Sequence, residues 1–253
     1  MILARSNVLP DIREEGKDHL VEVHERSVSL VTGAASGIGA AVAARLAARG
    51  WRVAGLDLRE SETDLPLVAD VADSGAVREA ADRAARELGP VSLLVTVAGH
   101  YEMLPVSEIG NEGWKRMLSV HLGGTRNACA AVLPAMLVAG RGRIITISSE
   151  LALGGGREDA HYAAAKGAII GLTKSLAAEV AERGVRVNSV APGPTDTPLL
   201  SPDSPWRDPA FLQTLPLRRL VSPEEIAETV LFLAEEGDYL CGQVLSPNAG
   251  AVI

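Results

Sequence analysis

The sequence predicts an α/β fold of three layers, in which a doubly wound parallel sheet of about seven strands carries helices on both faces. Short apolar runs alternate with Ala-rich segments of helical length along most of the chain. The runs are almost continuously apolar, as expected for strands that are buried on both faces. A chain of 253 residues with 47% hydrophobic and 22% charged residues is large enough to bury one full core.

The expected elements follow one another in a regular order. Strands are predicted at 28–32, 51–56, 65–69, 91–97, 143–148, 185–190 and 243–245. Helices are predicted at 38–49, 74–88, about 111–138 and 160–183, and a last one begins at Ser222-Pro223. Gly50, Gly89 and Gly184 stand where three of these helices should end. Ser74 is the expected cap of the second helix, and Pro134 is expected to bend or end the third.

Two segments do not fit this alternation. Residues 1–26 are charged and lack an apolar period, so we expect a loosely held N-terminal extension followed by a single domain over 27–253. His19 and His24 lie in the extension, but no cysteine or acidic cluster accompanies them, and we expect no metal site. Residues 192–220 are rich in proline and have no period, which indicates a mobile flap over a site.

Charge and composition narrow the function classes. A formal net charge of −8 disfavours nucleic acid and anionic membranes as partners. We expect no apolar run long enough to cross a bilayer, and the first residues do not resemble a secretory signal. Cys129 and Cys241 are isolated, which indicates buried thiols in a reducing compartment and hence a cytoplasmic protein.

Tyr162 and Lys166 are the most informative pair in the chain. They lie four residues apart in a predicted helix and therefore share one of its faces. With three Tyr and four Lys in the chain, chance gives roughly 0.05 such pairs. An adjacent ammonium should lower the pKa of a phenol and prepare it for proton transfer near neutral pH. A solvated helix face is the alternative interpretation of the pair.

A glycine-rich loop follows the first strand and opens the first helix. It has the spacing Gly33-x-x-x-Gly37-x-Gly39, in a context that suits a dinucleotide pyrophosphate. Taken alone, the loop could equally be a tight turn. Asp57 ends the second strand, where a carboxylate can bind the ribose hydroxyls and repel a 2′-phosphate. We therefore expect NAD rather than NADP; Arg59 is the only nearby cation, and a solvated turn carboxylate is the alternative for Asp57.

Together these features resemble the short-chain dehydrogenase/reductase family over residues 28–253. The resemblance rests on the glycine loop, Asp70-Val71, Ala98-Gly99, Ser149, Tyr162-x-x-x-Lys166, Asn188 and Pro192-Gly193-x-x-x-Thr197, all in the family's order. It implies a Rossmann-like sheet and the exchange of a hydride and a proton between NAD(P)(H) and an alcohol or carbonyl.

The resemblance also implies a role for each matching residue. Tyr162 would be the general acid/base, Lys166 would hold the nicotinamide ribose, and Ser149 would hydrogen-bond the substrate oxygen. The remaining cofactor contacts would come from Gly33, Ser36, Gly37, Ile38, Gly39, Asp57, Asp70, Val71, Ala98, Gly99, Pro192, Gly193, Thr195 and Thr197. Asn188 would brace the fold, and Ser148 is a weaker rival to Ser149 because strand alternation points it to the other face.

Two positions depart from the family pattern. Thr96-Val97 stands where most relatives have two asparagines, and Thr96 is expected to compensate for the lost bracing. His121 stands where most relatives carry an asparagine that holds a water for proton relay. An imidazole can donate and accept, and its pKa lies near working pH. We therefore hypothesise a relay or water-holding role for His121, with a structural histidine as the alternative.

The substrate side is expected to come from 100–103, 151–161 and the flap residues Leu199, Leu200, Trp206 and Phe211. Arg157 could pair with an anionic substrate, but a solvated loop arginine is the preferred interpretation, and His161 should point away from Tyr162. We expect an NAD-dependent enzyme that interconverts a secondary alcohol and a ketone, and assembles as a homotetramer. A 3-oxoacyl-thioester reductase and a non-catalytic dinucleotide-binding sensor are the alternatives.

Overall fold

The computed structural model describes residues 27–253, so the predicted extension at 1–26, with His19 and His24, lies outside the described part of the chain. Seven strands form one sheet in the order β3-β2-β1-β4-β5-β6-β7, and every neighbouring pair is parallel. The strands are β1 (Val28–Thr32), β2 (Arg52–Asp57), β3 (Leu65–Val68), β4 (Val91–Thr96), β5 (Gly142–Ile147), β6 (Val185–Val190) and β7 (Val244–Leu245). The sequence-based prediction of a doubly wound parallel sheet is confirmed.

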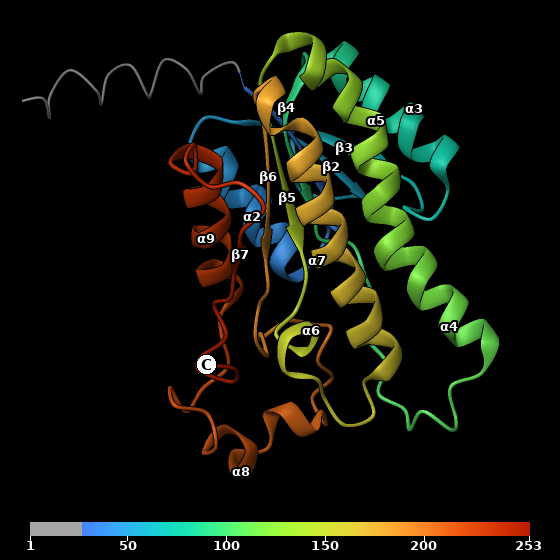
Figure 1. Ribbon diagram of the computed structural model, residues 1–253, viewed down its shortest axis with the longest axis vertical. Coiled ribbons are helices and arrows are strands. Elements are labelled where there is room, and N and C mark those ends of the chain that lie inside the picture. The colour runs from blue at the N-terminus through green and yellow to red at the C-terminus, as the bar shows by residue number, and fades with distance from the viewer. Residues whose placement is uncertain (1–26) are drawn as a thin grey trace, which may run out of the picture.

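Helices cover both faces of this sheet, as Figure 1 shows. Helices α2 (Gly37–Ala48) and α9 (Pro223–Glu235) pack against each other on one face. Helices α3 (Ser74–Glu87), α5 (Gly124–Ala139) and α7 (Ala160–Val180) cover the other face. Because the winding direction changes after β3, the loops that follow β1 and β4 diverge and open a crevice at the carboxyl ends of the strands.

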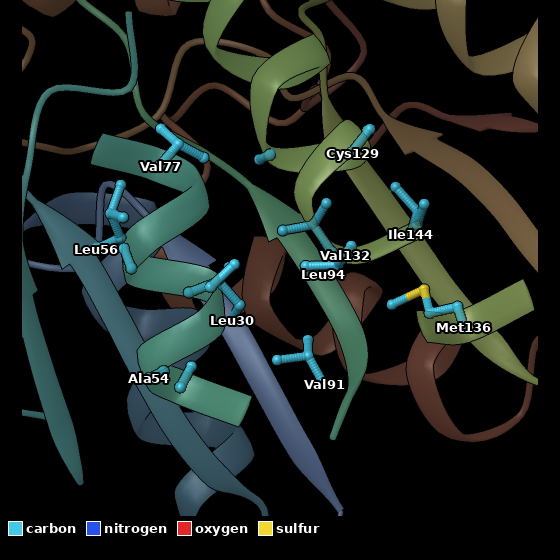
Figure 2. Close-up of a cluster of buried hydrophobic side chains, with 14 of the residues drawn as sticks. Leu30, Ala54, Leu56, Val77, Val91, Leu94, Cys129, Val132, Met136 and Ile144 are labelled. Carbon is cyan, nitrogen blue, oxygen red and sulfur yellow. The ribbon is translucent and has the colours of Figure 1, made fainter. Parts of the chain in front are cut away.

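Successive strand residues point to opposite faces and build two separate cores. Leu30, Leu94 and Ile144 point toward the first core, where they meet side chains of α3 and α5, among them Val77 and Val132 (Figure 2). Their chain neighbours Val31, Val95 and Ile145 point to the second core, under α2 and α9. There they pack with side chains of these helices, among them Val42 and Ile226. Burial on both faces explains why the strands are almost continuously apolar in the sequence.

The long helix predicted at 111–138 is continuous but locally irregular. It consists of α4 (Asn111–Leu118), a π-helical turn η1 (Ser119–Gly123) and α5. Pro134 lies inside α5 and does not end it. The helix continues to Ala139 and is capped by Gly140, which adopts a left-handed conformation. The irregularity falls at η1 instead. A π-helical turn inserts an extra residue into the helix and is frequent at functional sites.

The continuous helix Asn111–Ala139 is long and apolar enough to cross a membrane by length and composition, contrary to the sequence-based expectation. Its α5 part packs against α3 and β4. A core helix of a water-exposed domain passes the same test, because packing on a sheet also requires apolar side chains.

Some element boundaries differ from the prediction. Asp73, not Ser74, caps α3, because its carboxylate accepts from the backbone N–H groups of Gly75 and Ala76. The cap of α9 is confirmed as a capping box between Ser222 and Glu225. The flap contains two short helices, η3 (Pro205–Arg207) and α8 (Pro209–Leu212), and α6 (Leu151–Gly154) follows β5.

Candidate active site

A cleft of about 870 Å³ opens at the carboxyl ends of β1, β2, β4, β5 and β6. Every catalytic and cofactor-binding residue expected from the sequence lines it except Gly39. A β-carbon at Gly39 would collide with the carbonyl of Gly33, so Gly39 permits the close packing of α2 on the loop rather than forming the wall of the cleft. The expected residues therefore come together from loops that are far apart in the sequence.

The glycine loop forms one end of the cleft. Gly33 and Gly37 adopt positive φ angles of 70° and 54°, which only glycine adopts without strain. A β-carbon on Gly33 would lie 2.8 Å from the backbone nitrogen of Ala98. The side chain of Ser36 makes no capping hydrogen bond at the start of α2. The backbone N–H of Ala40 donates to the Ser36 carbonyl and begins the helical hydrogen bonding. The first turn of α2 thus presents free N–H groups to the cleft, as a pyrophosphate requires.

Asp57 ends β2 beside this loop. Its carboxylate accepts from the backbone of Ala35 at 3.1 Å and from that of Arg59 at 3.2 Å. Two backbone donors hold the carboxylate against the glycine loop, where it lines the cleft. The Arg59 guanidinium donates to Ser36 Oγ at 3.4 Å. The site therefore offers a carboxylate for ribose hydroxyls, with one cation at its rim.

Asp70 and Val71 form the wall beyond Asp57. The Asp70 carboxylate accepts from Ala72 N at 2.8 Å, and the Val71 carbonyl accepts from Asn127 Nδ2 at 2.9 Å. These bonds fix the backbone after β3, where the resemblance implies two of the cofactor contacts.

The segment after β6 forms another wall of the cleft. Pro192, Gly193, Thr195 and Thr197 all line it. Thr195 Oγ1 donates to the Gly193 carbonyl at 2.8 Å, which closes the turn. The side chain of Thr197 approaches Gly37 so closely that a β-carbon there would lie 3.2 Å away. The segment after β6 therefore lies directly against the glycine loop.

Tyr162 and Lys166 project from α7 into the cleft. Lys166 Nζ donates to the Ile147 carbonyl at 2.9 Å and lies 5.6 Å from the centroid of the Tyr162 ring. Burial lowers the pKa of Lys166 to about 8. Burial also raises the pKa of Tyr162 above its ordinary value; the Glu150 carboxylate adds to the rise, and the Ser149 hydroxyl opposes it.

The expected lowering of the Tyr162 pKa by Lys166 is therefore not a property of the chain alone. Desolvation disfavours the buried phenolate, and the ammonium is directed to a main-chain carbonyl. In the chain alone the phenol of Tyr162 therefore keeps its proton at neutral pH.

Ser149 lies at the end of β5 and is joined to a residue that the sequence reasoning missed. Its Oγ donates to Glu150 Oε2 at 2.8 Å and accepts from Leu151 N at 3.2 Å. Glu150 is only 6% exposed and lines the cleft. Burial raises its pKa to about 7. The available signal was a carboxylate directly after the candidate serine, where a strand ends inside the fold.

His121 lies on the π-helical turn and is 2% exposed. Its Nε2 lies 2.8 Å from the carbonyl and 3.2 Å from the nitrogen of His100, and its Nδ1 has no hydrogen-bond partner among residues 27–253. The ring packs edge-on to Tyr162. The pKa of His121 is held well below its usual value, mainly by burial and to a smaller extent by the charge of Lys166. The expected ionisation near working pH is thus absent, and His121 is a neutral imidazole with one unused nitrogen.

The substrate side is only partly as expected. His100, Tyr101, Leu199, Leu200 and Trp206 line the cleft. Of the expected segment 151–161, only Leu151 reaches it, and Glu102, Met103 and Phe211 do not. From the long helix, Arg116, Ser119 and Val120 line it in addition.

Arg157 and His161, for which the sequence indicates no preferred role in the site, lie away from the cleft. Arg157 is exposed on its loop. His161 is buried beside Trp114 on the far side of α7, as expected from its position next to Tyr162.

A chain of hydrogen bonds joins the flap to the start of α7. Trp206 Nε1 donates to Tyr101 Oη at 2.9 Å, and Tyr101 Oη donates to Asp159 Oδ1 at 2.7 Å. Asp159 is buried directly before α7. The flap that the sequence predicts as mobile is therefore held by Tyr101, a side chain that also contacts the start of α7.

Three further residues brace the site. Asn188 Nδ2 donates to the Leu240 carbonyl at 3.0 Å, and its Oδ1 accepts from Gln243 N at 3.0 Å, so its predicted bracing role is confirmed. Ser148 also lines the cleft, but its Oγ donates to the Lys166 carbonyl at 2.8 Å and so is engaged with the backbone of α7. Thr125 donates to Thr96 at 3.4 Å, which supplies part of the bracing expected there.

Comparison with known proteins defines the class. The strand order and the position of the cleft at the carboxyl ends of the strands are those of a dinucleotide-binding α/β fold. The family model described as "Enoyl-(Acyl carrier protein) reductase" matches residues 33–251. The chain belongs to the short-chain dehydrogenase/reductase family.

Several curated relatives are similar over most of their length. The chain is 34% identical to the 3-oxoacyl-[acyl-carrier-protein] reductase FabG of Thermotoga maritima, covering 90% of this chain and 99% of the relative. It is 38% identical to the D-threitol dehydrogenase of Mycolicibacterium smegmatis, covering 83% and 86%. Among solved structures, the ligand-free aldohexose dehydrogenase of Thermoplasma acidophilum is 30% identical, with a TM-score of 0.84 and coverage of 91% and 95%.

Proposed function

We propose that the protein is an NAD-dependent dehydrogenase that interconverts a secondary alcohol and a ketone, with Tyr162 as the general acid/base. The observation that carries the proposal is the convergence of Ser149, Tyr162 and Lys166 on one cleft that also contains Asp57. Three segments of the chain supply these groups: the end of β2, the residues after β5, and helix α7.

The proposed chemistry divides between the cofactor and the chain. When bound, the oxidised nicotinamide supplies a hydride acceptor and a positive charge. Tyr162 Oη removes the proton of the substrate hydroxyl during oxidation and returns it during reduction. Ser149 holds the substrate oxygen, and Lys166, fixed by Ile147, holds the ribose and adds positive charge near the phenol. The apolar side chains of the flap exclude water above these groups.

NAD is the proposed cofactor because of Asp57. A 2′-phosphate beside its carboxylate would place like charges in contact, whereas two ribose hydroxyls can donate to it. Arg59 is the cation at this end, and its guanidinium already donates to Ser36. In this arrangement Arg59 supports the loop and does not offset the repulsion by Asp57.

Alcohol oxidation is the proposed direction, since cells usually hold NAD in the oxidised form. Two relatives with printed names of this kind support an alcohol substrate: the D-threitol dehydrogenase and a cis-4-hydroxycyclohexanecarboxylate dehydrogenase from Sinomonas cyclohexanicum, 36% identical. A 3-oxoacyl-thioester reductase is the second candidate, favoured by the FabG relatives. A net charge of −8 disfavours the acidic carrier protein that such a substrate would bring.

We further propose a cytoplasmic homotetramer in which α5 and α7 pack against copies of themselves. Small exposed residues on α7, among them Ala164, Gly171 and Ala178, permit close approach of a second helix. Light scattering measures the mass directly, and a mainly monomeric mass would contradict this part of the proposal.

One assay series tests the function. Thermal shift with NAD⁺ and NADP⁺ measures cofactor binding, and reduced-nicotinamide absorbance over panels of secondary alcohols, ketones and 3-oxoacyl thioesters measures turnover. The proposal predicts turnover of simple alcohols with NAD⁺. Turnover confined to 3-oxoacyl thioesters would support the reductase instead, and binding without any turnover would support a sensor.

A further inference from the structure

Glu150 is a buried acid in the cleft to which the proposed mechanism gives no task. It stands between β5 and α6, and its backbone nitrogen donates to the Pro192 carbonyl at 2.9 Å. This bond fixes Glu150 beside Pro192, one of the residues expected to contact the cofactor. A buried carboxyl normally has a cationic partner or a dedicated set of donors.

Glu150 has no cationic partner within residues 27–253, where the structure gives it no salt bridge. Its Oε2 accepts from Ser149 Oγ at 2.8 Å. The ionisable groups that act on it or on Ser149 are Tyr162 and Asp159, both from the start of α7, and the ammonium of Lys166 is engaged with Ile147. Burial raises the pKa of Glu150 to about 7, so both of its forms are populated near neutral pH.

The contact matters because Ser149 has a single hydroxyl hydrogen. While Glu150 is ionised, this hydrogen is directed to the carboxylate, and Leu151 N occupies one lone pair of the same oxygen. Ser149 then has no hydrogen left for a substrate oxygen. Once Glu150 is protonated, its own hydroxyl can donate to Ser149 Oγ, and the serine hydrogen becomes free to turn to the substrate.

We propose that Glu150 is a positioning residue that releases the Ser149 hydroxyl to the substrate oxygen when its carboxyl is protonated and withdraws it when ionised. This inference rests on the proposed function. In ketone reduction the hydride adds to the carbonyl carbon and Tyr162 delivers the proton to the oxygen, whose developing negative charge Ser149 stabilises. Glu150 keeps its proton throughout turnover and only sets the direction of the serine hydrogen.

The other ionisable groups of the cleft do not mask a step in the pH profile that comes from Glu150. The pKa of Tyr162 is raised above its ordinary value and that of His121 is held well below, so neither titrates near pH 7 in the chain alone. The pKa of His100 is lowered, mainly by burial. Lys166, with a pKa of about 8, would give a separate step at higher pH. A step that disappears with Glu150 is thus distinguishable from one that belongs to Lys166.

The test measures kcat and KM for ketone reduction across about pH 5 to 9. For the unaltered protein we expect kcat to fall by about 10-fold or more as Glu150 ionises, the loss of one donor to the oxyanion, with little change in KM. Glu150→Gln places an amide donor beside Ser149 Oγ permanently. It should abolish this step and be at least about 10-fold faster than the unaltered protein above the step. Glu150→Asp keeps a carboxylate and should keep a step.

Two further variants make the result specific. Glu179→Gln removes the same charge from an exposed position on α7 and should reproduce the unaltered profile. Ser149→Ala should be slow throughout and lack the Glu150 step, because no hydroxyl remains to be redirected. This variant tests the inference even if Glu150→Gln fails to fold.

A Glu150→Gln profile parallel to that of the unaltered protein, or a Ser149→Ala profile that keeps the step, would overturn the inference. Tyr162→Phe separates this result from the proposed function. A fast Tyr162→Phe variant contradicts the function itself, whereas a slow one combined with an unchanged Glu150→Gln profile contradicts only the role of Glu150.

Discussion

The indole Nε1 of Trp206 donates to the phenolic oxygen of Tyr101 at 2.9 Å, across 105 positions of sequence. Tyr101 donates a hydrogen bond to Asp159 and packs edge-on to the ring of Tyr162, with 5.0 Å between the ring centroids. One ring thus connects the flap to the residue proposed to transfer the proton. The position of the flap and the orientation of Tyr162 depend on a shared neighbour.

Removing the indole donor should loosen the flap without touching the reacting groups. In Trp206→Phe the contact with Phe211 can persist, but the bond to Tyr101 is lost. One hydrogen bond is worth about 1 kcal/mol, so we expect KM for the substrate to rise about 5-fold with kcat nearly unchanged. Steady-state kinetics measure both. Trp114→Phe, outside the cleft lining, is the matched control, and equal KM values in the two variants would contradict this role of Trp206.

Asp57 should decide between the two dinucleotides. Asp57→Ala removes the charge that repels a 2′-phosphate and the acceptor for the ribose hydroxyls. We expect kcat/KM with NAD⁺ to fall by about 10-fold or more, and the preference for NAD⁺ over NADP⁺ to narrow or reverse. Asp82→Asn, exposed on α3, is the control for the change in charge. An unchanged ratio of the two cofactors would show that Asp57 only braces the loop through Ala35 and Arg59.

His121 should act as a neutral group. Since its pKa lies well below 6.5, its ionisation adds no step to the activity profile around neutral pH. His121→Asn keeps a side chain that donates and accepts and should retain kcat within about 3-fold, while His121→Ala should lower it by about 10-fold or more. The relay or water-holding hypothesis fails if the alanine variant matches the unaltered protein in both rate and pH profile.

Glu150 should also make the stability of the fold depend on pH. Its pKa is about 7 in the folded protein against 4.5 in the free side chain, so the folded state binds the extra proton between these values. Its contribution to stability is therefore present in full below about pH 4.5 and is lost as pH rises through about 7, by up to about 3 kcal/mol. Chemical denaturation should show Glu150→Gln gaining on the unaltered protein over this range. A constant difference at all pH values would contradict a buried, titrating Glu150.

The chain pattern was enough to predict the sheet and its parallel strands, and the family resemblance named many of the residues that line the cleft. Apolar runs and helix ends are local signals, and the glycine loop with Asp57 lies within one strand–helix–strand unit. The pKa values were not accessible in this way, since they depend on burial and on where a charge is directed. Lys166 was expected to act on Tyr162, but its ammonium is directed to Ile147, and Glu150 was not foreseen as a neighbour.

The irregular parts were the hardest to predict for the same reason. The π-helical turn at 119–123 has no proline or paired glycines at its start, and Pro134, which has the strongest local signal, lies inside a continuous helix. Packing of α5 on the sheet overrides the local preference at Pro134. The bond from Trp206 to Tyr101 is likewise a product of tertiary structure alone.

Replacement of Tyr162 by phenylalanine tests the central claim most directly, because it removes one oxygen and leaves the ring that packs against Tyr101 and His121. Alcohol oxidation should be measured with saturating NAD⁺, and cofactor binding checked by thermal shift. The account predicts unchanged cofactor binding and a kcat lower by about 10²-fold or more in both directions. A variant that binds the cofactor and keeps the rate of the unaltered protein would contradict the assignment of proton transfer to Tyr162.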